Sequence, residues 1–300
     1  MIGTAAGGGF PQWNCACPNC QSVRNGEDGL KPLMQSSLAI SVNGEDWYLI
    51  NAGPDVNRQI LSFSELHAGP GIREIPLAGV ILTDAELDHT IGLLCLREGS
   101  SLTIYGTDTV YRNLNRAFPV FPMLENYCSW EWQTLAPNAP LQIGNQADGL
   151  VTIETIPVSS KPPLYASSQS EIGDVWEVGL LLHNEQTGKC LAYFPTIESF
   201  TPEIEASLQK ADVVMVDGTF WSAGELVQLG ATSRNAHDMG HLPVGGASGI
   251  AEKLRSLPAE RKILIHINNS NPILRKGSME RKTLDKLGIE VAYDGLELEV

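Results

Sequence analysis

The stretch AGVILTDAELDHTIGLLCLREG, residues 78–99, decides the fold. Its first six residues, Ala78–Thr83, form an apolar run that predicts a buried strand. Residues 88–99 carry acidic residues at the start and apolar residues at helical spacing, so they predict a helix. The intervening turn Thr83–His89 contains three carboxylates and one imidazole. A strand, a polar turn and a helix form the arrangement in which a mixed α/β scaffold exposes functional side chains.

Further apolar runs lie on both sides of this stretch and alternate with amphipathic segments. The runs Leu38–Val42 and Trp47–Asn51 are joined through Asn43-Gly44, which is typical of a hairpin. Residues 201–211 predict a helix that begins with a Thr cap and a Pro, and residues 289–300 predict a strand, a turn and a short strand. We therefore expect mixed sheets covered by helices. Because nothing resembles a linker, we expect one domain over residues 1–300.

The composition indicates an acidic chain with enough apolar residues for a sizeable core. Hydrophobic residues make up 43% of the sequence, and the formal net charge is −15 at pH 7. This charge argues against nucleic-acid phosphates and anionic lipid as main partners. No apolar run approaches the ~20 residues needed to span a bilayer, and the first residues lack the features of a signal peptide. We expect a cytoplasmic protein without a membrane span.

Half of the six cysteines lie in one short loop, residues 15–20, as Cys15, Cys17 and Cys20. The spacing Cys-x-Cys-x-x-Cys can wrap three thiolates around one tetrahedral Zn²⁺. The alternative is a set of buried or redox-active cysteines, but clustered thiols in a reducing compartment favour zinc. The site would be structural, because a closed sulfur site has no open position for substrate. Its fourth ligand has to come from elsewhere in the chain.

Other candidate ligands follow the predicted strands. Asp217 ends the apolar run VVMVD, and His266 ends ILIH. Strands of one sheet bring their ends to one edge, so these residues and Asp88-His89 predict a carboxylate–imidazole metal site. In the alternative, the acidic turn only complements the helix dipole, and His266 is a core or cap residue. His241, in the loop MGHLP, is a candidate proton-transfer group or a residue that starts a helix.

The hairpin strands, TDAELDHT after a strand, VDGT at 216–219 and the late strand-end His together resemble the metallo-β-lactamase fold family. The resemblance implies an α/β (α+β) fold, an αββα sandwich of two mixed sheets flanked by helices, with metals along one edge. The family motif His-x-His-x-Asp-His falls on Asp84–His89, where only the last two residues match. The third His of the family falls at Ser159-Ser160. The bridging Asp corresponds to Asp217 or is lost at Phe194-Pro195, and the final His matches His266.

The whole chain, from residue 3 to 300, also resembles a family of pyrroloquinoline quinone (PQQ) biosynthesis proteins. The matching words include GTAAGGGFPQWNC, LDHTIGLL, MGHLP and HINNSNPIL. This resemblance implies an iron-dependent hydroxylase acting on the tyrosine ring of a Glu-Tyr precursor, or a PQQ-binding carrier that assists PQQ release or transport. A metal-dependent hydrolase ranks last. The implied partners are a small-molecule or dipeptide precursor or PQQ itself, other proteins of the pathway, and a second copy of the chain.

The resemblance also implies roles for the site residues. Asp84 and Glu86 in place of imidazoles weaken the site for two zinc ions and suit one Fe²⁺ with open positions. We expect these two carboxylates to orient ligands or to bind the ammonium group of the substrate, and His241 to exchange the phenolic proton. The predicted active-site ligands are Asp88, His89 and His266, with Asp217 as a fourth ligand or a carboxylate that supports one. In relatives of the PhnP type, a His three positions after the active-site His completes the zinc site; that position is Asn269, a weak ligand.

Overall fold

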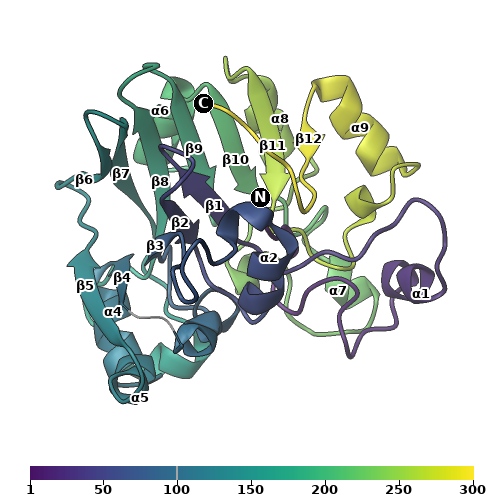
Figure 1. Ribbon diagram of the computed structural model, residues 1–300. Helices are drawn as coiled ribbons and strands as arrows, with labels where there is room; N and C mark the ends of the chain where they lie inside the picture. Colours follow the sequence, from purple (N-terminus) through teal and green to yellow (C-terminus); the bar gives the residue numbers. More distant parts are fainter. Residues whose placement is uncertain (99–100) are drawn as a thin grey trace. The chain divides into compact units, whose positions relative to one another are not determined.

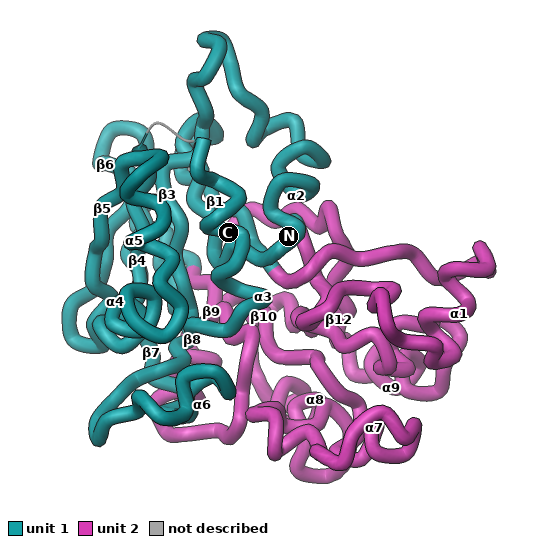
Figure 2. The backbone as a smooth tube through the Cα atoms, turned by 90° about the horizontal axis from the view of Figure 1, so that it is seen from below, with its two compact units in different colours: residues 1–2, 37–189 teal, residues 3–36, 190–300 magenta. Residues whose placement is uncertain are grey.

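The computed structural model describes residues 1–98 and 101–300, whose contacts divide the chain into two compact units (Figure 2). Unit 1 comprises residues 1–2 and 37–189, and unit 2 comprises residues 3–36 and 190–300. The topology contains two mixed sheets, of five and seven strands, flanked by helices (Figure 1). This confirms the predicted fold class. A single domain over residues 1–300 stays a prediction.

The five-stranded sheet begins with the predicted hairpin, whereas the last three strands of unit 1 belong to the seven-stranded sheet. The strands of unit 1 are β1 (Leu38–Ser41), β2 (Trp47–Ile50), β3 (Leu77–Ile81), β4 (Ser101–Gly106), β5 (Ser129–Thr134), β6 (Leu141–Asn145), β7 (Gly149–Ser159) and β8 (Glu177–Asn184). β1 and β2 pair antiparallel, and the side chain of Asn43 closes their turn by accepting hydrogen bonds from the N–H groups of Glu45 and Asp46. β2 to β5 pair in parallel, whereas β6, β7 and β8 pair antiparallel. β3 leads directly into the polar turn Thr83–His89, so its position in the sheet places that turn.

The helices of unit 1 are short. They are α2 (Val56–Ser62), η1 (Ser64–Leu66), α3 (Leu87–Thr90), η2 (Ile91–Leu96), α4 (Asp108–Asn115), α5 (Val120–Leu124) and η3 (Leu164–Gln169). The helix predicted over residues 88–99 is helical in place but mostly 3₁₀ in type, and Gly99 lies outside the described residues. The N–H of Gly92 donates to the carbonyl of Ala52 at 2.9 Å. A Cβ at Gly92 would lie 2.2 Å from the carbonyl oxygen of Gly53, so only glycine permits this approach.

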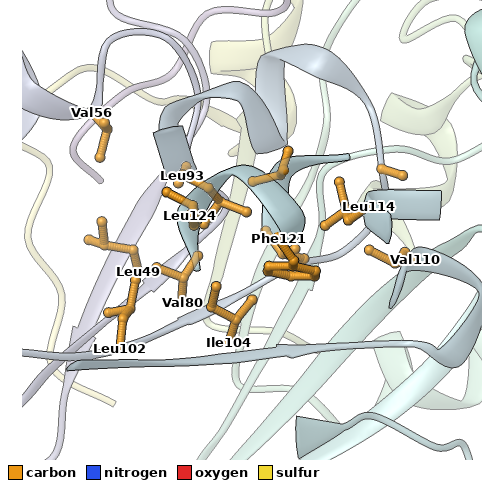
Figure 3. Close-up of a cluster of buried hydrophobic side chains, with 14 of the residues drawn as sticks. Leu49, Val56, Val80, Leu93, Leu102, Ile104, Val110, Leu114, Phe121 and Leu124 are labelled. Atoms are coloured by element: carbon orange, nitrogen blue, oxygen red, sulfur yellow. The ribbon is translucent and has the colours of Figure 1, made fainter. Parts of the chain in front are cut away.

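The core of unit 1 packs α4 and α5 against the five-stranded sheet (Figure 3). The labelled side chains come from β2, β3 and β4 on one side and from α2, η2, α4 and α5 on the other. Phe121 of α5 is fully buried, and its ring stacks on Trp130 with 4.0 Å between the ring centroids. Burial of this apolar surface holds β3 rigidly, so the turn that follows it has a fixed support.

Unit 2 contains the four parallel strands β9 (Cys190–Phe194), β10 (Val213–Asp217), β11 (Arg261–Ile265) and β12 (Glu290–Val291), side by side in Figure 1. Its helices are α1 (Pro18–Arg24), α6 (Pro202–Lys210), α7 (Glu225–Gln228), η4 (His237–Met239), α8 (Ile250–Arg255), η5 (Pro272–Leu274) and α9 (Met279–Leu287). The parallel pairing brings the ends of β10 and β11 to one edge: Asp217 pairs with Ile265 in the register. Asp217 and His266 therefore lie at the same edge of these strands.

Two further predictions concern unit 2. α6 begins as predicted, because Thr201 Oγ1 accepts a hydrogen bond from the N–H of Ile204 and Pro202 occupies the first turn. The short strand predicted near the C-terminus is wrong, since residues 292–300, all described, contain no strand. After β12 the carboxylate of Asp294 accepts hydrogen bonds from Thr4 Oγ1 and the N–H of Met34, which hold this segment to the N-terminal part of unit 2. Within the described ranges, no helix combines the length and apolarity needed to cross a membrane.

Candidate metal centres

The cysteine loop of unit 2 gathers three sulfur atoms. The Sγ atoms of Cys15, Cys17 and Cys20 lie within 4.8 Å of one another. Cys17 and Cys20 are buried and pack with Ala5 and Phe10 in a small apolar cluster. The loop turns into α1 immediately after Cys17, so Cys20 on the first turn faces back toward the loop. Three thiols at this separation fit one tetrahedral Zn²⁺.

The side chain of Asn269 occupies the fourth side of this sulfur cluster. Its Nδ2 atom lies 3.1 Å from Cys15 Sγ, 3.5 Å from Cys17 Sγ and 3.3 Å from Cys20 Sγ. Burial raises the pKa of Cys20 to about 11, although the Asn269 amide opposes this shift. A bound cation is therefore required to hold Cys20 as a thiolate at neutral pH. Ligation by Asn269 stays a prediction.

In unit 1, the polar turn after β3 forms a hydrogen-bonded network around His89. His89 Nδ1 lies 2.7 Å from Asp84 Oδ2, which also accepts a hydrogen bond from Thr83 Oγ1 at 2.7 Å. Asp84 Oδ1 accepts from the N–H of Glu86 at 2.9 Å. These contacts assign the proton of His89 to Nδ1 in the neutral ring, so Nε2 is the nitrogen suited to a metal. Nε2 lies 3.9 Å from an oxygen of Asp88.

Two residues that the sequence interpretation missed support this turn. Asn51 follows β2 in a left-handed backbone conformation, with a φ of 66°. Its Nδ2 donates to Thr83 Oγ1 at 2.8 Å, and its Oδ1 accepts from the N–H of Thr83 at 3.0 Å. Asn is among the residues that adopt this conformation most readily, which was the available signal at the end of the hairpin. Asn51 and Thr83 thus hold Asp84 in place.

The charges in this turn favour an ion pair between His89 and Asp84. Burial lowers the pKa of His89, but the charges of Asp84 and Asp88 outweigh it and raise the value to about 10. For Asp84, burial favours a higher pKa, yet the neighbouring His89 holds it below its ordinary value. In the metal-free chain, His89 is protonated at neutral pH. A metal that binds Nε2 must displace that proton.

A second cluster, formed by Asp217, His241 and His266 and called the histidine cluster, lies in unit 2 at the ends of β10 and β11. Asp217, His241 and His266 each offer one ligand atom within 4.8 Å of the others. The rings of His241 and His266 stack, with centroids 5.4 Å apart and an interplanar angle of 25°. His241 Nδ1 lies 2.8 Å from Asp217 Oδ2, and His266 Nδ1 lies 2.8 Å from Thr219 Oγ1. Both imidazoles are therefore oriented through Nδ1, and Nε2 is their metal-binding atom.

Asp217 is fully buried, and both of its oxygens accept hydrogen bonds. Oδ1 accepts from the N–H and the hydroxyl of Thr219, and Oδ2 accepts from the N–H of Ile197 at 3.0 Å in addition to His241. Burial favours a higher pKa for Asp217, but His241 and His266 hold it below the ordinary value. Of the two roles predicted for Asp217, this geometry favours support of a ligand over direct ligation.

The predicted site residues thus form three groups. Unit 1 contains Asp84, Glu86, Asp88 and His89; unit 2 contains Asp217, His241 and His266, and separately Cys15, Cys17, Cys20 and Asn269. The predicted ligand set of Asp88, His89 and His266 draws on both units and stays a prediction. His241, predicted as a proton-transfer group or a residue that starts a helix, also has the orientation of a ligand. Thr219 was missed, because no motif marks a hydroxyl that orients an imidazole.

Comparisons with known proteins identify the family to which the chain belongs. The Beta-lactamase superfamily domain matches residues 46–267. Coenzyme PQQ synthesis protein B from Methylococcus capsulatus is 40% identical over 299 residues, covering 99% of this chain and 98% of the relative. The protein of the same description from Klebsiella pneumoniae is 41% identical over 299 residues, covering 99% and 96%. The crystal structure of Zn²⁺-bound PqqB from Methylobacterium extorquens has a TM-score of 0.89 at 34% identity, covering 100% of this chain and 98% of that one.

With its two mixed sheets and with Asp and His residues at the strand ends, the chain is a member of the β-lactamase superfamily. A diphosphatase of the PhnP family, at 18% identity and a TM-score of 0.66, shares the fold alone. Within the superfamily, the chain belongs to the coenzyme PQQ synthesis protein B (PqqB) family, a family of PQQ biosynthesis proteins.

Proposed function

We propose that this chain acts in PQQ biosynthesis as an oxygenase with one Fe²⁺, which hydroxylates the tyrosine ring of a Glu-Tyr precursor. The observation that carries the proposal is the hydrogen bonding of Asp84. This residue stands where the hydrolytic motif has its first His, and its oxygens accept hydrogen bonds from Thr83, Glu86 and His89. Asp84 therefore serves to orient an imidazole and does not replace the missing ligand.

A centre with fewer imidazoles suits one metal ion better than two. A hydrolytic di-zinc centre needs enough nitrogen ligands to hold both ions, whereas an Fe²⁺ centre for O₂ chemistry uses few imidazoles, a carboxylate and open positions. The imidazoles of His89 and His266 and the carboxylate of Asp88 are the donors that fit this description, and His241 is assigned to proton exchange. The Zn²⁺ bound by the Methylobacterium extorquens relative supports metal binding in general. We assign a structural Zn²⁺ to Cys15, Cys17 and Cys20, with Asn269 as the fourth ligand.

When bound, Fe²⁺ supplies the activation of O₂. Hydroxylation would insert one oxygen atom of O₂ into a ring C–H bond to give C–OH, and the other oxygen atom would leave as water with two electrons and two protons from an added reductant such as ascorbate. His241 accepts the phenolic proton at Nε2. Asp217, whose pKa lies below its ordinary value, stays ionised and stabilises the resulting imidazolium through Nδ1. Glu86 binds the ammonium group of the dipeptide, since the oxygens of Asp84 already accept hydrogen bonds within the turn.

The test is a single-turnover reaction with the full chain. The protein is loaded with Fe²⁺ without air, mixed with Glu-Tyr and ascorbate, and exposed to O₂; the ring-hydroxylated dipeptide is measured by mass spectrometry. We expect product from the wild type and from His67→Ala, which alters an exposed histidine outside the clusters. His266→Ala is expected to give none. Stoichiometric bound iron without hydroxylated product would refute the proposal.

A further inference from the structure

Three buried asparagines lie between the sulfur cluster and the histidine cluster of unit 2. These residues, Asn19, Asn269 and Asn271, are called the asparagine cluster below. Asn19 lies on the first turn of α1 between Cys17 and Cys20, and the other two lie on the loop that begins at His266. Buried amides are expected to have hydrogen-bond partners, and the partners of these three connect one site to the other.

On the sulfur side, Asn19 ties α1 to the loop. Its Nδ2 donates to the carbonyl oxygens of Asn269 at 3.1 Å and Asn271 at 3.0 Å. Its Oδ1 accepts from Arg275 Nε at 2.7 Å, and the same guanidinium donates to the carbonyl of Pro18 at 2.9 Å. Since Arg275 can only donate, it fixes the amide orientation of Asn19 and leaves Nδ2 for the two carbonyls.

On the histidine side, Asn271 ties the loop to the segment that orients His266. Its Nδ2 donates to the carbonyl oxygens of Gly218 at 2.8 Å and Thr219 at 3.2 Å, and its Oδ1 accepts from the N–H of Ile273. Thr219 Oγ1 in turn contacts both Nδ1 and the carbonyl oxygen of His266, each at 2.8 Å. A displacement of Asn271 would therefore move the hydroxyl that orients the imidazole.

The backbone of His266 requires such support. Its φ is 54°, a left-handed conformation that a non-glycine residue keeps only when the surrounding structure holds it. The next residue, Ile267, is held on both sides, because its N–H donates to Thr4 and its carbonyl accepts from Ala6, each at 2.9 Å. The asparagine cluster fixes the other end of the same loop.

We infer that the sulfur site positions His266 through Asn19 and Asn271. A cation on Cys15, Cys17 and Cys20 orders the loop before α1 and its first turn, and the asparagine cluster passes that order to Thr219 and His266. Filling the sulfur site then strengthens metal binding by the histidine cluster, and the effect is reciprocal. The inference rests on the proposed function in one respect: both clusters bind metal ions.

The test compares two variants of the full chain, one on the first turn of α1 and one at the residue that follows its last turn. Asn19→Asp keeps the acceptor for Arg275 and removes the amide donors, while Asn25→Asp makes the same change at the exposed end of α1. Each protein receives one equivalent of Zn²⁺ and is then titrated with Co²⁺, whose visible bands report the histidine cluster. We expect Asn19→Asp to bind this Co²⁺ about tenfold more weakly than the wild type, the size typical of residues that support ligands. Asn25→Asp is expected to match the wild type.

A second readout requires no metal at the histidine cluster. Hydrogen exchange at the amides of Gly218 and Thr219 is measured with and without one equivalent of Zn²⁺. We expect Zn²⁺ to slow this exchange several-fold in the wild type and in Asn25→Asp, but not in Asn19→Asp. If Asn19→Asp does not fold, as judged by circular dichroism, Arg275→Lys replaces it, because it releases the Asn19 amide while keeping the charge.

The outcomes separate the two proposals. Any of three results would overturn the inference. In the first, Zn²⁺ does not change hydrogen exchange at Gly218 and Thr219; in the second, the sulfur cluster binds no Zn²⁺. In the third, Asn19→Asp and the wild type bind Co²⁺ with equal affinity. Zn²⁺-dependent exchange in a wild type whose histidine cluster takes up neither Co²⁺ nor Fe²⁺ would overturn the proposed function and leave the positioning of the loop standing.

Discussion

Replacement of Asp217 by Asn tests the account of the histidine cluster most directly. Both carboxylate oxygens accept two hydrogen bonds, and on each oxygen one donor is a backbone N–H, from Thr219 or Ile197. Asparagine has one oxygen and one NH₂ group, so one of these buried N–H groups must face another donor in either orientation. That loss costs about 1–3 kcal/mol. His241 also loses its charged acceptor, and a hydrogen bond to a charged group contributes about 1.5–3 kcal/mol. The two losses together come to about 3–5 kcal/mol.

The assay is urea unfolding of the metal-free chain, followed by circular dichroism, with the exposed Asp28→Asn as the control. At neutral pH we expect Asp217→Asn to lower the free energy of unfolding by about 3–5 kcal/mol, and Asp28→Asn to have little effect. The melting temperature of Asp217→Asn should fall by about 10 °C.

The pH dependence gives this prediction a definite sign. The pKa of Asp217 in the folded chain lies below its ordinary value of 3.8, so the stability that it contributes is present above that value. The contribution is lost as the pH falls through the folded pKa, where the wild type also becomes neutral at this position. The difference between wild type and Asp217→Asn should therefore shrink in acid. No difference at neutral pH, or one that acid leaves unchanged, would refute the reasoning.

Three further predictions concern other parts of the structure. His89, with a pKa of about 10, stabilises the metal-free chain fully below the ordinary 6.5 and loses this effect as the pH rises through 10. After one equivalent of Zn²⁺ has filled the sulfur cluster, binding of a second metal ion at pH 8 should release the His89 proton, seen as a calorimetric heat that varies with the buffer and is absent in His89→Ala. Tyr165→Phe removes the hydrogen bond from Tyr165 Oη to the carbonyl of Ala85 at 2.6 Å, and should lower the free energy of unfolding in urea by about 1–2 kcal/mol. Phe121→Ala leaves a cavity in the core of unit 1 and should cost about 3–5 kcal/mol in the same assay; a loss below that of Tyr165→Phe would contradict the packing.

The sequence predicts those elements whose signals are local. The hairpin over residues 38–51 follows from apolar strands around Asn43-Gly44, and α6 follows from its Thr cap and Pro. The helix type over residues 88–96 and the absence of a strand in residues 292–300 were not predicted, because these segments bond to partners far away in the chain. The amide of Gly92 bonds to Ala52, and Asp294 bonds to Thr4 and Met34, none of which a local pattern contains.

The candidate site shows the same division. Strand ends followed by Asp or His identify where functional side chains gather, and Asp217 and His266 do lie at one edge of β10 and β11. Their roles depend on contacts that spacing cannot reveal. His241 reaches Asp217 from a loop 24 residues later, and His266 relies on Thr219, which is 47 residues earlier. The type of residue predicts the chemistry, whereas the donors around it decide the role.

Asp84 and Asp217 illustrate this point, because the two units build the same local arrangement around them. Asp84 follows β3 and Asp217 ends β10. Each accepts hydrogen bonds from a nearby Thr hydroxyl, from the N–H two residues later and from a histidine Nδ1. Asp84 Oδ2 and both oxygens of Asp217 accept two hydrogen bonds each, which occupies the lone pairs that a cation would use, while the imidazole that each carboxylate orients becomes a better ligand at Nε2. A carboxylate that accepts a hydrogen bond from a histidine Nδ1, as Asp84 and Asp217 do, is therefore evidence for a supported ligand, whereas Asp88 lies near Nε2 of His89. By this criterion the protein holds fewer direct ligands than its acidic turn suggests, which is the condition that favours a single metal ion with open positions over a hydrolytic pair.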